Sequence, residues 1–301
     1  MFTISRRQVL ATSLVTGLAF AWPPATSADE PAGRLLSLGG SVTEIVYALG
    51  AQDRLVGVDS TSFFPEAAQA LPNVGYLRRL SAEPVLALTP DLIIAEADAG
   101  PPEALAQLRA AGVAIVSVPD EPDIGGVLAK IDHVAAALGL HEKGAELARR
   151  VSTRYAGVRE RVARVAARPK VMFVLSAGKG APLVAGTGTS ATAIIEMAGG
   201  QNPIDGFPDY RPMTPEAGIN AQPDVILVTE RTLKLLGGMD RVRDLPGIQG
   251  TPAARNSAIV AMDGLLLLGF GPRTPDAVWQ LALRLHPGLN PVDQAGHRGH
   301  R

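Results

Sequence analysis

The sequence predicts an α/β protein of two similar lobes, each built on a mainly parallel sheet and joined by a long helical segment. Short apolar runs rich in β-branched residues alternate with longer amphipathic stretches, the pattern occurs twice, and a helix-forming stretch separates the two copies. Strands that alternate with helices pair in parallel, so each copy predicts a sheet of its own. The strand-like runs are 93–94, 113–118, 171–175, 225–228 and 259–260.

Residues 1–28 have the composition of an export signal peptide. Arg6 and Arg7 precede an apolar stretch that reaches Phe20, and small residues close the segment at Ala28. The stretch is too short for a membrane anchor, so we expect cleavage after Ala28 and an exported mature protein. The arginine pair resembles a twin-arginine signal, and an ordinary Sec signal is the alternative.

Composition narrows the classes of partner. The chain has no cysteine, so it predicts neither a disulfide framework nor a lipid-attachment cysteine, and we expect a soluble protein without a lipid anchor. Loss of residues 1–28 would remove two of the 28 basic residues and none of the 29 acidic ones, leaving a formal charge of −3. Nothing in this balance suggests a nucleic acid or an anionic membrane as partner.

The first lobe is expected over residues 29–122 and the second over 169–290, because three segments of the first match three of the second. In the first matched pair, segments 41–50 and 190–199, each segment predicts a helix that is capped at its start and ends at a glycine. The extra residues of the first copy lie between Gly50 and Tyr76. The matched segments are 41–50 with 190–199, 76–96 with 210–230, and 114–116 with 258–260.

Between the copies, residues 123–168 predict a linking backbone helix. Apolar residues recur near helical spacing, and residues 138–141 are expected to break the stretch into two pieces. Two lobes joined once by a helix describe a clamshell whose cleft is the default binding site. Residues 291–301 are expected to form a flexible tail.

Three motifs carry a resemblance to a known family. They are residues 36–44 (LSLGGSVTE), 75–83 (GYLRRLSAE) and 271–275 (GPRTP). The chain resembles the helical-backbone, class III periplasmic binding proteins of ABC transporters, which serve haem, cobalamin, ferric siderophores and some transition metals. The likeness spans residues 34–288, and the motifs look like those of the haem-binding branch.

The resemblance implies that Tyr76 is the axial ligand of a ferric haem b and that Arg78 braces it. Ferric iron favours an anionic oxygen, and a tyrosine phenolate is a known haem ligand. A free tyrosine titrates near pH 10, so the iron and a neighbouring guanidinium must hold the anion. Arg78, or failing that Arg79, is placed to supply that charge.

The remaining contacts to haem are assigned from the chemistry of its propionates and its apolar macrocycle. Its propionates require cationic donors, for which Arg211 is the candidate. Tyr210, from the matched loop of the second copy, is expected to face the macrocycle, and Phe63 with Phe64 to cover its rim. Members of the branch that hold two haems use a histidine where residues 176–179 (SAGK) offer none, so we expect one haem per chain.

Glu83 and Glu216 occupy matched positions at the start of a helix in each copy. In the resembling family such glutamates dock onto the permease, although a carboxylate is also favoured there by the helix dipole. The resemblance thus implies an inner-membrane haem permease and its ATPase as partners, periplasmic localisation, a role in iron acquisition and an outer-membrane receptor system as an upstream source. We expect a monomer.

Other classes of function fit the sequence less well. The five histidines are not placed to converge on a metal ion, and no phosphate loop or Ser-His-Asp order is visible, so no catalytic residues are assigned. Two alternatives remain open. One keeps the transport role with cobalamin or a ferric siderophore as cargo, and the other is a haem scavenger that never meets a permease.

Overall fold

The first sheet is parallel throughout. The computed structural model describes residues 33–177 and 180–289, so the expected export signal and tail lie outside the described residues. Strand order is β2-β1-β3-β4, with Leu36 of β1 aligned to Ile93 of β3. The strands are β1 (Leu35–Leu38), β2 (Leu55–Val58), β3 (Leu92–Glu96) and β4 (Ala114–Val118).

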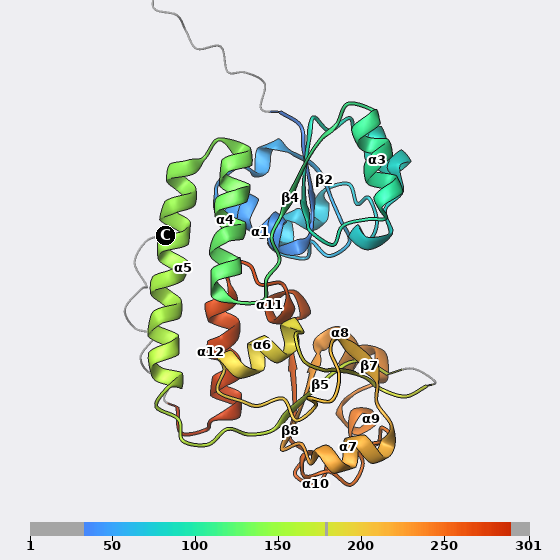
Figure 1. Cartoon of the computed structure of the whole chain (residues 1–301), viewed down its shortest axis with the longest axis vertical. Coiled ribbons are helices and arrows are strands. Elements are labelled where there is room, and N and C mark those ends of the chain that lie inside the picture. The colour runs from blue at the N-terminus through green and yellow to red at the C-terminus, as the bar shows by residue number, and fades with distance from the viewer. Residues whose placement is uncertain (1–32, 178–179, 290–301) are drawn as a thin grey trace, which may run out of the picture. The chain divides into compact units, whose positions relative to one another are not determined.

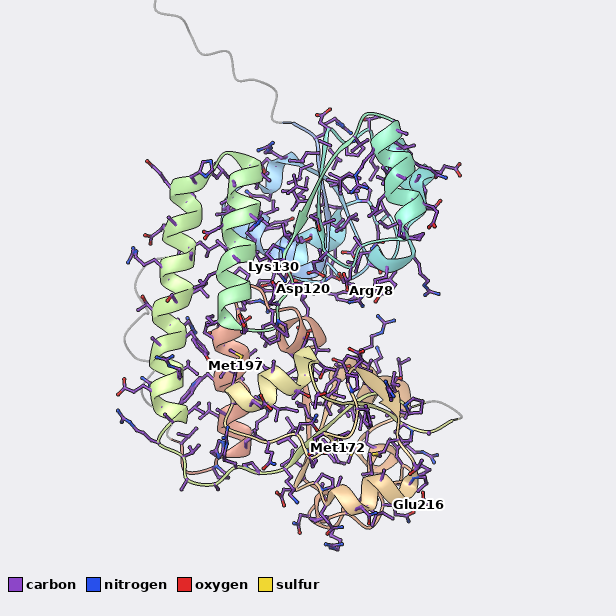
Figure 2. All side chains as sticks on the ribbon, in the orientation of Figure 1. Arg78, Asp120, Lys130, Met172, Met197 and Glu216 are labelled. Atoms are coloured by element: carbon purple, nitrogen blue, oxygen red, sulfur yellow. The ribbon has the colours of Figure 1, made fainter. Side chains whose placement is uncertain are left out.

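The second sheet is mixed, with strand order β7-β6-β5-β8-β9. β5, β8 and β9 pair in parallel, whereas β6 and β7 form an antiparallel edge. Met172 of β5 is fully buried in this sheet (Figure 2). Two sheets with parallel cores and helices between the strands confirm the α/β fold class. The strands are β5 (Val171–Ser176), β6 (Leu183–Ala185), β7 (Tyr210–Pro212), β8 (Val225–Thr229) and β9 (Ile259–Met262).

The repeated segments form corresponding elements in the two halves of the chain. α1 (Gly40–Ala48) and α6 (Ser190–Met197) each end before a glycine of positive φ, 70° at Gly50 and 82° at Gly199. α2 (Ala82–Ala87) leads into β3 just as α7 (Pro215–Ala221) leads into β8. The starts differ from the expectation, because the residue that caps α6 is Thr189 and α1 has no side-chain cap.

The segment between the two sheets forms two helices that lie side by side (Figure 1). Asp123 caps α4 (Ile124–Leu138) by accepting the Gly126 amide at 2.7 Å, and α4 ends at left-handed Gly139. α5 (His141–Val162) then runs for 22 residues. Helix therefore stops at Val162, six residues short of the expected end at 168. The other helices are η1 (Gln52–Arg54), η2 (Glu66–Ala70), η3 (Leu77–Arg79), α3 (Pro102–Ala110), α8 (Glu230–Leu236), α9 (Met239–Arg243), α10 (Pro252–Arg255), α11 (Gly264–Leu268) and α12 (Thr274–Leu285).

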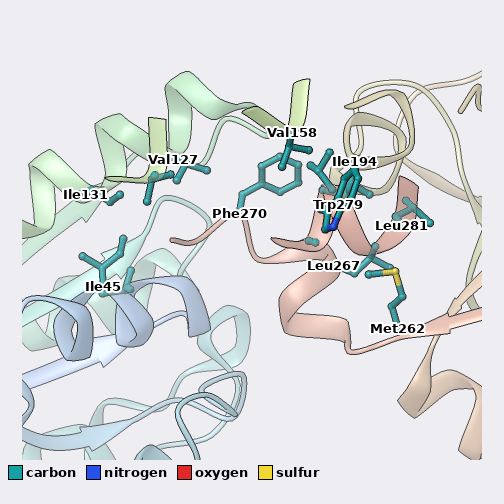
Figure 3. Packing of buried hydrophobic residues seen from close by; sticks show 14 of the residues in the cluster. Ile45, Val127, Ile131, Val158, Ile194, Met262, Leu267, Phe270, Trp279 and Leu281 are labelled. Atoms are coloured by element: carbon teal, nitrogen blue, oxygen red, sulfur yellow. The ribbon is translucent and has the colours of Figure 1, made fainter. Parts of the chain in front are cut away.

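One buried apolar cluster joins elements of both sheets (Figure 3). It includes Ile45 of α1, Ile131 of α4, Val158 of α5, Ile194 of α6 and Trp279 of α12. Burial of apolar area stabilises a fold by roughly 25 cal/mol per Å², so a shared core ties both sheets to the α4–α5 pair. Among the residues that the structure describes, none of the helices has the length and apolarity needed to cross a bilayer.

Candidate functional site

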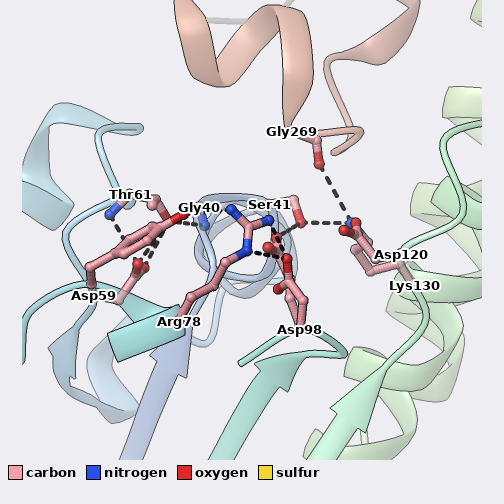
Figure 4. A network of polar contacts seen from close by, with 11 residues as sticks. Gly40, Ser41, Asp59, Thr61, Arg78, Asp98, Asp120, Lys130 and Gly269 are labelled. Atoms are coloured by element: carbon pink, nitrogen blue, oxygen red, sulfur yellow. Dashed lines mark hydrogen bonds and ion pairs between the residues drawn. The ribbon is translucent and has the colours of Figure 1, made fainter. Parts of the chain in front are cut away.

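Acidic residues follow three of the four strands of the first sheet, β2, β3 and β4, at the edge where the strands end. Asp59 follows β2, Asp98 follows β3, and Asp120 follows β4 (Figure 4). Glu96 is the last residue of β3. The carboxyl ends of parallel strands meet at one edge, which is where ligands bind in open α/β sheets. The same edge holds Tyr76 and the start of α1, so the candidate site is assembled there.

Tyr76 stands at the start of η3 and is held by Arg78. The Arg78 Nη1 donates to the Tyr76 hydroxyl oxygen at 2.5 Å, and the same guanidinium donates through Nε to Asp98 Oδ2 at 2.5 Å and through Nη2 to that oxygen. Arg79 lies over the Tyr76 ring, with its guanidinium carbon 6.0 Å from the centroid. Arg78 is therefore the arginine that bonds the phenol oxygen.

The charge on Arg78 is reinforced by its partners. Partial burial lowers the pKa of Arg78. The hydrogen bond and ion pair with Asp98 and the contact with Tyr76 raise this pKa by more than burial lowers it, so the net pKa lies above the ordinary value. The guanidinium thus stays cationic beside the phenol oxygen. The half-buried Tyr76 and the exposed Arg78 (53% of its side chain) leave this pair accessible to a ligand.

Tyr210 is half-buried and packs against residues of the second half of the chain. Its ring meets Phe173 edge-on at 6.4 Å between centroids, and its hydroxyl bonds Thr189 and the Ala191 amide at the start of α6. Burial raises the pKa of Tyr210, whereas these hydrogen bonds and the charge of Arg78 lower it to a smaller extent.

The structure brings Tyr76 and Arg78 together, while the other expected haem contacts pack on different neighbours. Arg211, exposed on β7, has its guanidinium carbon 5.7 Å from the Phe207 ring centroid. Phe63 is 45% exposed. Glu83 and Glu216 are both exposed and lie in the first turns of α2 and α7, as expected from their matched positions.

Side chains of the first half of the chain bind two backbone amides at the start of α1. Buried Asp59 accepts the Gly39 amide at 3.0 Å, and Thr61 accepts the Gly40 amide at 2.9 Å. Gly39 has a φ of 119°, and a Cβ there would lie 2.4 Å from the Glu96 carboxyl carbon. Only glycine fits at position 39, because any Cβ there would collide with the Glu96 carboxyl group.

A fully buried lysine organises the polar residues behind the site. Lys130 of α4 donates to Asp120 Oδ1 at 2.6 Å, to Ser41 Oγ at 2.9 Å and to the Gly269 carbonyl at 3.5 Å (Figure 4). Ser41 in turn donates to Glu96 Oε1 at 2.6 Å. A buried ammonium is tolerated only when its donors are paired, and here they join α1, α4, the exit of β4 and the segment after α11.

Glu96 has a raised pKa in this network. Burial raises the pKa of Glu96 to about 7, helped by the charges of Asp120 and Asp98, while Lys130 and the Ser41 hydrogen bond oppose the shift. Because the folded-state pKa lies above the unfolded one, the protonated form is favoured on folding. This stabilisation is complete below pH 4.5 and is lost as the pH rises to about 7.

We expect Glu96→Gln to flatten the pH dependence of stability. Gln retains an oxygen for Ser41 but cannot ionise, so at pH 8 the variant should exceed the unmodified protein in unfolding free energy by up to about 3 kcal/mol. At pH 4.5 the two should agree closely. Denaturant unfolding at a series of pH values measures this difference, and parallel curves for the two proteins would contradict the prediction.

A partly buried ion pair connects two of the three motifs. Arg273, which precedes α12, donates through Nε to Glu44 Oε2 at 3.1 Å and through Nη2 to Oε1. Burial raises the pKa of Glu44, and Arg273 opposes that rise. The guanidinium carbon of Arg273 also lies 3.6 Å from the ring centroid of Phe64. The motifs at 36–44 and 271–275 therefore meet at this pair.

Sequence reasoning missed the residues that support the site. Asp98, Lys130, Glu96 and Asp120 were not singled out, because each looks like an ordinary charged residue in a linear pattern. A signal was available for the acids, since each of them ends or follows a predicted strand of a parallel sheet. Within residues 33–177 and 180–289, no three His, Asp or Glu side chains gather as a metal ion would require.

The fold and this edge of the sheet define a ligand-binding protein built on two α/β sheets. The sequence profile of the periplasmic binding protein family matches residues 35–265, so the chain belongs to that family. Among solved structures it is similar to the periplasmic haem-binding protein BhuT in complex with two haems, with 43% identity, a TM-score of 0.82, and coverage of 86% of this chain and 99% of BhuT.

Two further relatives bear on the ligand. The periplasmic haem-binding protein RhuT from Roseiflexus sp. RS-1, in its apo form, is 42% identical with a TM-score of 0.83, covering 86% of this chain and 100% of RhuT. The vitamin B12-binding protein of Yersinia pestis is 31% identical over 205 residues, which cover 66% of this chain and 70% of that protein.

Proposed function

We propose that this chain is the periplasmic substrate-binding component of an ABC importer that captures ferric haem and delivers it to a permease. Tyr76 is the iron ligand, and Arg78 stabilises its phenolate. The observation that carries the proposal is the 2.5 Å contact between Arg78 Nη1 and the Tyr76 hydroxyl oxygen at the carboxyl edge of the first sheet. Similarity to haem-binding proteins at 42–43% identity supports this choice of ligand.

The other contacts follow from the size and charge of haem. A site between the first lobe (29–122) and the second (169–290), linked through 123–168, would place Arg211 at the propionates. Tyr210 would face the macrocycle and Phe63 its rim. One haem per chain is proposed, with no catalytic step. The protein acts as an exported monomer without a lipid anchor, and an outer-membrane haem receptor system supplies it.

Cobalamin is the second candidate cargo, because the vitamin B12-binding protein of Yersinia pestis is 31% identical to this chain. Cobalamin carries its own lower ligand and would not need Tyr76 as a ligand. The two cargoes are therefore separated by the role of the phenol oxygen.

Titration with ferric haem tests the proposal. The chain lacking residues 1–28 is titrated and followed by visible absorption, which reports stoichiometry and ligation together. A saturable end point at one equivalent with a ferric tyrosinate spectrum is expected. An end point at two equivalents would replace the single-haem stoichiometry, and absence of saturable haem binding alongside tight cobalamin binding would reject haem as the cargo.

Docking through Glu83 and Glu216 gives a separate prediction. Replacing both by Gln should lower haem transfer to the reconstituted permease and ATPase by about tenfold, while haem affinity stays unchanged, because exposed interface charges act mainly on association. Each single variant should show a smaller loss. Glu103→Gln, an exposed carboxylate in the first turn of α3, is the matched control. Normal transfer by the double variant would exclude this docking mode.

A further inference from the structure

Asp98 shares the guanidinium that holds Tyr76. We propose that Asp98 is a positioning residue for haem ligation, which acts by fixing Arg78 against the phenol oxygen. This inference rests on the proposed function, because it assigns a second residue to the support of the Tyr76 ligand. Arg78 and Asp98 face each other at the edge of the first sheet (Figure 4).

The backbones that carry the two residues are clamped together. The Gly100 amide donates to the Leu77 carbonyl at 2.9 Å, and the Leu80 amide donates to the Gly100 carbonyl at 2.8 Å. Leu77 and Leu80 are both buried. The Asp98 loop is thus docked on η3, and its contact with Arg78 is fixed by the fold on both sides.

Because the guanidinium is planar, its contact with Asp98 orients the nitrogen that donates to Tyr76. Arg78 places Nε and Nη2 on Asp98 Oδ2, and this leaves Nη1 facing the Tyr76 oxygen. A guanidinium is planar and presents its donors as a rigid fork, so an anchor on one side determines where the other side points. The Arg78 side chain is 53% exposed, and without Asp98 its head would be free to turn to water.

The negative charge of Asp98 also repels a phenolate at Tyr76. The guanidinium lies between the two anions, and the Asp98 side chain is 35% exposed, so solvent screens their repulsion. A hydrogen bond from Arg78 to a phenolate oxygen is charge-assisted, and it exists only when the guanidinium is in place. Loss of position therefore outweighs relief of repulsion, and removal of Asp98 should weaken haem binding.

A double-mutant cycle in the chain lacking residues 1–28 tests this role. Arg78→Ala should weaken ferric haem binding by about 10- to 100-fold, the usual effect of removing a partner of a metal ligand. Asp98→Ala should produce a loss within about threefold of that value. The double variant should match Arg78→Ala alone, because a residue that acts through Arg78 has no effect in its absence. Asp98→Glu should recover part of the loss, and Glu103→Gln should bind as the unmodified protein does.

The phenolate-to-iron charge-transfer band gives a readout that a purely structural defect would not move. Loss of the Arg78 hydrogen bond raises the energy of the phenolate electrons, so the band should shift to longer wavelength in Arg78→Ala and by a similar amount in Asp98→Ala. An unshifted band, tighter haem binding by Asp98→Ala, or additive losses in the double variant would overturn the proposal. Asp98→Asn, which preserves shape, repeats the test if Asp98→Ala folds poorly. If Tyr76→Phe kept the band, the proposed ligand itself would fail, independently of Asp98.

Discussion

Replacing Lys130 by Met is expected to lower the free energy of unfolding at pH 8 by about 3 kcal/mol. Lys130 is fully buried, and its ammonium bonds Asp120, Ser41 and the Gly269 carbonyl. Met fills a similar volume, so the loss arises from unpaired polar groups and not from a cavity. Breaking a buried ion pair costs about 3–5 kcal/mol. The lower end applies because the Asp120 side chain is 35% exposed and can regain water.

The loss should depend on pH through Glu96. Lys130 lowers the pKa of Glu96, so without the ammonium this pKa rises further and ionisation of Glu96 in the folded protein becomes more costly. The difference between Lys130→Met and the unmodified protein should therefore grow from pH 5 to pH 8. Combining Lys130→Met with Glu96→Gln should recover part of the loss at pH 8, because no carboxylate then remains to ionise there.

Denaturant unfolding at both pH values measures the effect, with Lys143→Met as control. Lys143 is exposed on α5 and donates to the Leu49 carbonyl at 3.2 Å, so its replacement should cost less than about 1 kcal/mol. Some buried ion pairs can be replaced by apolar residues without loss of stability. Equal stability of Lys130→Met and Lys143→Met would place Lys130 in that class.

The fold was predictable because its signals are local and repeated. Short β-branched runs mark β3, β5 and β8, and the match of 76–96 with 210–230 predicts the same helix-then-strand order in both halves. The antiparallel edge strands β6 and β7 were not predicted, since three-residue strands carry too little periodicity. Tyr76 and Tyr210 match in sequence, yet only Tyr210 lies in a strand.

The site was only partly predictable because half of it is assembled by long-range contacts. Tyr76 and Arg78 lie two residues apart, so a motif contains both. Asp98 is 20 residues from Arg78, and Lys130 is 89 residues from Ser41. Such pairings depend on strand order in the sheet and on the placement of α4, which no local pattern of charge encodes. The Glu44–Arg273 pair spans 229 residues for the same reason.

Replacing Tyr76 by Phe is expected to abolish the ferric tyrosinate spectrum and to weaken haem binding at least about 100-fold, which corresponds to about 2.7 kcal/mol. Phe keeps the ring against its neighbours but lacks the oxygen that ferric iron favours. Arg78 cannot replace it, because a guanidinium is cationic and offers no lone pair to a metal.

Tyr210→Phe is the matched comparison, because it removes the same atom from the corresponding position of the second half. The Tyr210 hydroxyl is bound at the start of α6, so its loss should cost about 1 kcal/mol of stability and change haem affinity only a few-fold. Visible spectra and titrations of the two variants decide the assignment. Equal losses of affinity, or a tyrosinate band that survives in Tyr76→Phe and disappears in Tyr210→Phe, would move the ligand to the second sheet. A large difference in the expected direction would place the iron at the edge where Arg78, bound by Asp98, donates to the phenol oxygen.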